Sequence, residues 1–149
     1  MYKALDVAKW FLNQNNVEQK LHCDVESISN LKLQKLLYYA QGCYLGLYNE
    51  PLFDEELLAW RHGPVVDCIY QEFKKFSSNG IKCDEKPQVH FSVEAENVMK
   101  WVYDEFGQYT AWRLRNMTHQ EAPWLKTEQN DVISKEIIRD YFLENYVEA

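Results

Sequence analysis

The stretch SNLKLQKLLYYAQGCYLGLYN, residues 29–49, carries the strongest periodic pattern in the chain. Apolar side chains recur in it at steps of three and four residues: Leu33, Leu36, Leu37, Ala40, Tyr44 and Leu47. This spacing is that of one face of an α-helix. Ser29 or Asn30 suits the N-cap, because a short polar side chain can accept a hydrogen bond from the first turn. The stretch therefore predicts a helix over residues 30–48.

Two glycines lie four residues apart on a neighbouring face of this helix, at Gly42 and Gly46, together with Tyr39. Glycine in a helix interior lowers helix stability, so we expect another backbone to pack closely against this strip. The same spacing occurs in membrane helix dimers. Lys32 and Lys35 share the helix, however, and argue against a membrane setting.

Five further helices follow from similar patterns and from start and stop signals, near residues 2–14, 64–77, 93–106, 110–117 and 134–147. Gly63-Pro64 is expected to start the second of these, because proline suits the first helical position. Trp60, Gly63 and Pro64 are expected to have structural roles. The polar stretch NQNNVEQKLHCDVESIS, residues 13–29, is predicted as a loop.

Several shorter segments are less regular. Residues 52–61 fit either a short strand or a helical turn, and Val89–Phe91 is a candidate strand. Thr118 and Glu121 have the T-x-x-E spacing of a capping box, and Pro123 limits any helix there to one turn ending at Trp124. The pattern as a whole predicts a mainly α fold: a single compact domain over residues 1–149, with about six helices and one or two short strands.

Composition narrows the classes of function. The chain has 149 residues and a formal net charge of −7. Its lysines and arginines are scattered rather than gathered into the basic track that a nucleic-acid binder needs, so direct nucleic-acid binding is not expected. An acidic surface suits a basic protein partner better. With no apolar run of 18 residues and no signal peptide, we expect a cytoplasmic protein that does not enter a membrane.

Few residues suggest catalysis. Arg61-His62-Gly63 has the tripeptide of histidine phosphatases, but it follows an acidic segment and precedes Pro-Val-Val. His119 and Glu121 are two residues apart, which is poor geometry for an acid–base pair on one turn. The four cysteines lack Cys-x-x-Cys spacing. We expect no enzyme activity, cofactor, metal or catalytic residue.

Three segments, in order, form a more specific pattern: KLQKLLYYAQG at residues 32–42, AWRHGPVV with the following IYQEF within 59–73, and MTHQEAPW at 117–124. This set resembles the SocA-like, or Panacea, antitoxin domain, a phage-associated family. The resemblance extends from Leu5 to Phe142. In that family the position of His62 is variable, which makes it a poor catalytic residue.

The resemblance implies a helical binding module that neutralises a cognate toxin protein by direct contact; one branch of the family also delivers its toxin to a protease complex. Two alternatives stay open: a phage-derived interaction or protease-adaptor protein acting on a host factor, and a phosphatase-like enzyme using His62. The candidate partner-binding residues are Lys35, Tyr38, Tyr39, Tyr48, Trp60, His62, His119 and Trp124. Tyr38 and Tyr48 are expected to be exposed, as aromatic hot-spot residues.

Overall fold

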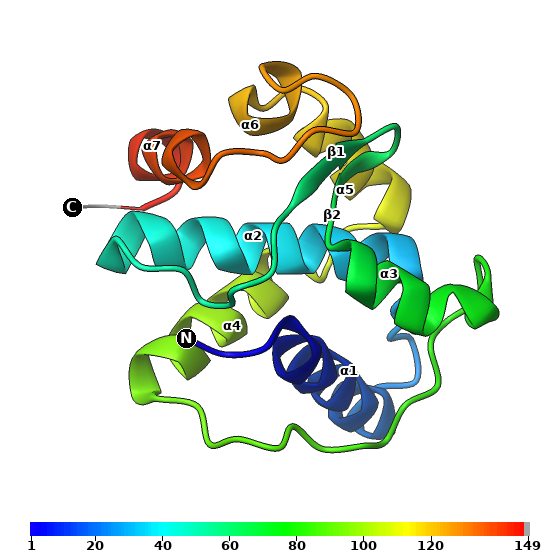
Figure 1. Cartoon of the computed structure of the whole chain (residues 1–149). Helices are drawn as coiled ribbons and strands as arrows, with labels where there is room; N and C mark the ends of the chain where they lie inside the picture. Colours follow the sequence, from blue (N-terminus) through cyan, green and yellow to red (C-terminus); the bar gives the residue numbers. More distant parts are fainter. Residues whose placement is uncertain (148–149) are drawn as a thin grey trace.

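In the computed structural model, which describes residues 1–147, helix α2 (Asn30–Tyr48) runs through the centre of the molecule (Figure 1). It is buried over most of its length and packs against α1, α3, α4, α5, α7 and strand β2. Ser29 is its N-cap, and its side chain accepts a hydrogen bond from the backbone N–H of Lys32 at 3.2 Å. The helix predicted at 30–48 is therefore confirmed, and it forms the core around which the other elements are arranged.

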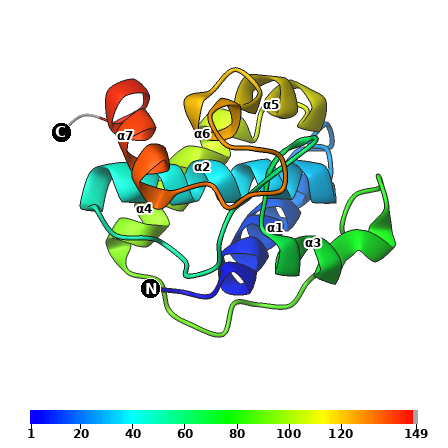
Figure 2. The ribbon, with the colours of Figure 1, turned by 45° about the horizontal axis from the view of Figure 1, so that its top comes forward.

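The remaining helices surround α2 on two sides (Figures 1 and 2). They are α1 (Ala4–Leu21), α3 (Asp67–Phe73), the short 3-10 helix η1 (Lys74–Phe76), α4 (Val93–Phe106), α5 (Ala111–Thr118), α6 (Ala122–Leu125) and α7 (Lys135–Asn145). Strands β1 (Leu58–Trp60) and β2 (Gly63–Val65) form an antiparallel hairpin. The predicted mainly α fold is confirmed. Within residues 1–147, no helix is both long and apolar enough to cross a membrane.

The glycine strip of α2 is the surface on which α7 packs. A Cβ atom at Gly42 would lie 2.3 Å from the ring of Phe142, and one at Gly46 would lie 2.9 Å from Val147 Cγ2 and 3.4 Å from the backbone nitrogen of Leu143. Because Cβ atoms do not approach other atoms within 3.0 Å, glycine at these two positions allows α7 and the residue after it to pack this closely. The expected close approach of another backbone is confirmed.

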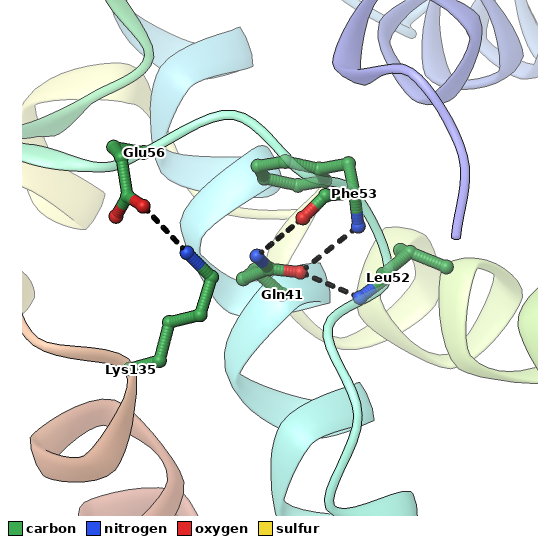
Figure 3. Close-up of polar contacts among 5 residues, drawn as sticks. All are labelled: Gln41, Leu52, Phe53, Glu56 and Lys135. Carbon is green, nitrogen blue, oxygen red and sulfur yellow. Dashed lines mark hydrogen bonds and ion pairs between the residues drawn. The ribbon is translucent and has the colours of Figure 1, made fainter.

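A buried glutamine holds the loop that leads from α2 to the hairpin (Figure 3). The Gln41 Oε1 atom accepts from the backbone N–H groups of Leu52, at 2.7 Å, and Phe53, at 3.2 Å. Its Nε2 group donates to the Phe53 carbonyl at 2.9 Å. Nearby, Lys135 at the start of α7 pairs with Glu56 at 2.8 Å. The Gln41 contacts satisfy buried backbone groups in the loop that precedes the hairpin.

Helix α1 continues to Leu21, so the loop predicted over 13–29 is wrong in its first half. The polar side chains that suggested a loop bind the backbone of other segments instead. The amides of Asn13, Asn15 and Asn16 donate to the carbonyls of Glu85, Glu26 and Cys83, at 2.7, 3.0 and 2.8 Å. This helix face is polar because it contacts loop backbone.

Gly63-Pro64 lies in strand β2, and α3 begins only at Asp67, so the prediction that this pair starts a helix is wrong. Pro64 pairs with Ala59, whose own N–H donates to the Asp131 carbonyl at 2.9 Å on the far side of β1. Pro64 therefore occupies a position at which the hairpin does not require an N–H group. The ambiguous segment 52–61 contains strand β1.

Two shorter predictions also differ from the structure. Residues 89–91 form bends and coil rather than a strand. Thr118 and Glu121 do not form a capping box: Thr118 ends α5 and its hydroxyl donates to the Arg115 carbonyl at 2.8 Å, whereas the Glu121 carboxylate accepts from buried tyrosines. The single helical turn expected around Pro123 and Trp124 is present as α6.

Candidate partner-binding site

The three distinctive sequence segments meet around the β1–β2 hairpin. The first lies on α2, the second forms the hairpin and continues into α3, and the third runs from the end of α5 into α6. Strand β2 packs against both α2 and α5. The indole Nε1 of Trp124 donates to the backbone carbonyl of Trp60 at 2.8 Å and so joins α6 to the hairpin. Residues far apart in the chain thereby form one surface, which we call the hairpin face.

At the tip of the hairpin, the exposed His62 contacts α5. Arg115 Nε donates to His62 Nδ1 at 3.3 Å, and the Arg115 guanidinium lies 4.4 Å from the ring centre of Trp112. Burial, and then repulsion by Arg115 and Arg61, lowers the pKa of His62. His62 is therefore an uncharged acceptor for Arg115, because a protonated Nδ1 has no free lone pair.

His119 lies one layer deeper, stacked on Trp124 with ring centres 3.9 Å apart and planes at 9°. Burial and the charge of Arg115 lower its pKa, which favours the neutral ring. Among the described residues, His119 Nε2 is the one buried side-chain nitrogen or oxygen atom without a hydrogen-bond partner. Neither histidine is paired with a carboxylate in this part of the chain.

Lys35 lies beneath the hairpin with 1% of its surface exposed. Its Nζ group donates to the Pro64 carbonyl at 2.8 Å. Burial, reinforced by repulsion from Arg115, lowers the pKa of Lys35 to about 7. Gly63 packs directly over this side chain with φ of +108°, and a Cβ atom there would lie 2.8 Å from Lys35 Cε and 2.7 Å from Thr118 Oγ1. Both the backbone angle and the space therefore require glycine.

The predicted partner-binding residues divide into three groups. Lys35, Trp60, His62, His119 and Trp124 are brought together at the hairpin face, with Trp60, His119 and Trp124 half-buried. Tyr48 is 42% exposed, as expected, but lies at the far end of α2, in a separate hollow with Trp101.

Tyr38 and Tyr39 form the third group. Both are fully buried, so the expectation that Tyr38 is exposed is wrong. The cause is Glu121, which precedes α6. Its carboxylate accepts from the hydroxyls of Tyr38 at 2.9 Å and Tyr39 at 3.0 Å, and also from Tyr146. These hydroxyls therefore point inward, and we call the four residues the carboxylate cluster.

Sequence reasoning considered Glu121 only as a capping or acid–base residue. Burial raises its pKa, and the three tyrosine hydrogen bonds oppose that shift because they stabilise the ionised form. The donors come from α2 and from the residue after α7, so no local spacing points to the cluster. It joins the C-terminal region to the core.

The hairpin face presents groups suited to binding another macromolecule. Trp112 is 55% exposed and Tyr70 is 37% exposed. Arg115 lies beside Trp112, and Arg61 is exposed at the hairpin tip. Tryptophan, tyrosine and arginine are the residue types that most often dominate binding energy at protein interfaces.

Comparison with known proteins gives the chain a family. The family described as "Antitoxin SocA-like, Panacea domain" matches residues 33–125, which is more than half of the chain and includes the whole hairpin face. A curated relative, Antitoxin SocA of Caulobacter vibrioides, is 47% identical over 55 residues, which cover 37% of this chain and 28% of the relative. No solved structure gives a significant match. The chain therefore belongs to the SocA-like antitoxin family, whose members carry the Panacea domain.

Proposed function

We propose that this protein is an antitoxin that neutralises a cognate toxin protein by direct binding, without catalysis. The observation that carries the proposal is the convergence of the family's matched segments on one face that exposes Trp112, Tyr70 and two arginines. Exposed tryptophan beside arginine is typical of interface hot spots. The chain acts as one domain in the cytoplasm, where the toxin is made.

The experiment is a growth assay. A reading frame adjacent to the gene of this protein is expressed alone and together with it. We expect growth to stop when the neighbour is expressed alone and to resume when both are present, and the two proteins to co-purify. If no neighbour is toxic and none co-purifies, the proposal fails, and a host factor becomes the partner to be sought.

Matched variants test the contact face. Trp112→Ala changes an exposed tryptophan on the hairpin face, whereas Trp101→Ala changes one that is 43% exposed on α4. A hot-spot side chain contributes about 2 kcal/mol or more, which corresponds to about 30-fold in affinity. We therefore expect Trp112→Ala to weaken toxin binding at least 30-fold and Trp101→Ala to change it little. The opposite order would move the interface to α4.

A further inference from the structure

A cavity of about 360 Å³ opens beneath the hairpin, between the first turns of α2 and the α3–η1 segment. Leu31, Trp60, Val65 and Tyr70 provide apolar walls. The rings of Trp60 and Tyr70 meet edge to face, with centres 5.2 Å apart. A cavity of this size and character accommodates one or two apolar side chains.

The charges around this cavity are all positive. Lys35, Arg61 and Lys74 line it together with the uncharged His62, and none of its lining residues in the described chain is acidic. This is unusual in a protein with a net charge of −7. The hollow lined by Lys32, between α1, α2 and α4, provides the contrast, because Glu18, Asp24, Glu26 and Asp104 surround it. The local field under the hairpin therefore favours an anion.

Lys35 is the innermost of these cations. Its ammonium group has three N–H donors, and Pro64 accepts the hydrogen bond it makes to the protein. Among residues 1–147, no carboxylate lies within 4 Å of it. A buried ammonium group without a counter-charge is expensive to maintain. The backbone of Gly63 packs against this side chain, and a Cβ atom there would lie 3.2 Å from Nζ, so only glycine fits beside the ammonium group.

We propose that this cavity binds a toxin segment that carries a carboxylate next to an apolar side chain. The carboxylate pairs with the Lys35 ammonium group, and the apolar side chain packs between Trp60 and Tyr70. The inference rests on the proposed function for the identity of the partner, but the cavity chemistry can be tested without it. A nucleic-acid phosphate suits the site less well, because the acidic surface provides no continuing basic track.

The first experiment uses a small probe and the isolated protein. 3-Phenylpropionate has one ring and one carboxylate, and its amide has the same shape without the charge. In an NMR titration, we expect the acid to bind at least fivefold more tightly than the amide and to shift the Trp60 indole and Gly63 amide signals. Lys35→Met should remove the preference for the acid. Lys32→Met is the matched control, because Lys32 is also buried in α2 and donates to a backbone carbonyl, that of Gly107, at 2.6 Å.

Equal binding of acid and amide, or signal shifts around Lys32, would overturn the cavity assignment. If Lys35→Met does not fold, Arg115→Gln provides a second test, since Arg115 is half-exposed and adds to the positive field at Lys35. It should reduce the preference for the acid without abolishing it, and an unchanged preference counts against the site. Binding of a fluorescent single-stranded oligonucleotide that depends on Lys35 would also overturn the proposal in favour of a phosphate ligand.

The second experiment uses the purified toxin found in the growth assay. We expect Lys35→Met to weaken binding at least tenfold while Lys32→Met has little effect. Asp→Asn and Glu→Gln changes in the toxin should identify one acidic residue whose replacement weakens binding to the natural protein but does not weaken binding to Lys35→Met any further. If a C-terminal extension of the toxin weakens binding in this way instead, the carboxylate is that of the toxin's C-terminus. A tight complex that is indifferent to Lys35 would overturn this inference and leave the antitoxin function intact.

Discussion

Glu121 and Lys35 are both buried ionisable residues, Lys35 within α2 and Glu121 in contact with it. They differ in how far the protein satisfies their charge. Glu121 receives hydrogen bonds from three tyrosine hydroxyls, whereas Lys35 donates to one carbonyl, is repelled by Arg115 and shares its cavity with Arg61 and Lys74. The carboxylate cluster is complete within the chain. The lysine environment is not, since the described chain brings no counter-charge within 4 Å.

The comparison separates a structural site from a binding site. Glu121 receives its hydrogen bonds from the chain itself, and these bonds connect α2 to Tyr146. A buried charge of this kind has a structural role. A buried charge that is only partly satisfied, next to an apolar cavity, is stabilised further when a ligand supplies the missing partner.

Replacing Glu121 with alanine should be severely destabilising. It leaves three buried tyrosine hydroxyls without their acceptor, and breaking a buried network of this kind lowers the free energy of unfolding by about 3–5 kcal/mol. Urea denaturation followed by circular dichroism measures the change. Glu128→Ala, at an exposed position nearby, is the control and should change stability by less than about 0.5 kcal/mol. A loss below about 1 kcal/mol for Glu121→Ala would show that the cluster is not structural.

The Lys35 site should appear as a pH dependence of stability. Burial lowers the pKa of Lys35 from 10.5 to about 7, so between these values the unfolded chain binds the proton more tightly than the folded one. The contribution of Lys35 to the free energy of unfolding therefore rises with pH, by at most about 1.4 kcal/mol per pH unit. The unfolding free energy of the natural protein minus that of Lys35→Met should increase by about 2 kcal/mol from pH 7 to pH 9.

His62, His119 and Arg115 face Lys35 and are present in both proteins, so their own contributions largely cancel in this difference. Denaturation at several pH values gives the two profiles. Parallel profiles would mean that Lys35 titrates as it does in the unfolded chain, and the contrast with Glu121 would disappear.

The smallest effect should come from removing one donor of the carboxylate cluster. Tyr146→Phe deletes a single hydroxyl while Tyr38 and Tyr39 still donate to Glu121. We expect a loss of about 1 kcal/mol in unfolding free energy. Tyr141→Phe provides the control, because its ring packs in the same aromatic group. Equal losses for the two variants would mean that the hydroxyl of Tyr146 contributes nothing specific.

Local periodicity predicted the elements that bury an apolar stripe. Helices α2, α4, α5 and α7 lie close to their predicted ranges because their apolar residues face one core. Periodicity does not reveal helical residues whose polar side chains are satisfied by distant backbone, such as Asn15 in α1. Nor does it reveal that Gly63-Pro64 pairs with β1, which outweighs the tendency of proline to start a helix.

The candidate site was only partly predictable. Trp60, His62, His119 and Trp124 stood out because their segments resembled a family, and the structure brings them together. Lys35 also contacts the hairpin, and its role in binding a partner stays a prediction, whereas Tyr38 and Tyr39 belong to the carboxylate cluster. Tyr38 and Lys35 lie on one helix, three residues apart, and sequence alone does not show that each contacts a different neighbour.

The sequence by itself determined the mainly α fold, the central helix and the glycine strip on which α7 packs, because these depend on spacing along one segment and on residue size. Only the tertiary structure decided which buried charges are satisfied. The donors to Glu121 come from two regions of the chain, and the cations near Lys35 include Arg115 of α5 and Arg61 of the hairpin. Electrostatic and hydrogen-bonding interactions depend on distances in space, and these arise only when α2 has gathered the other elements around it.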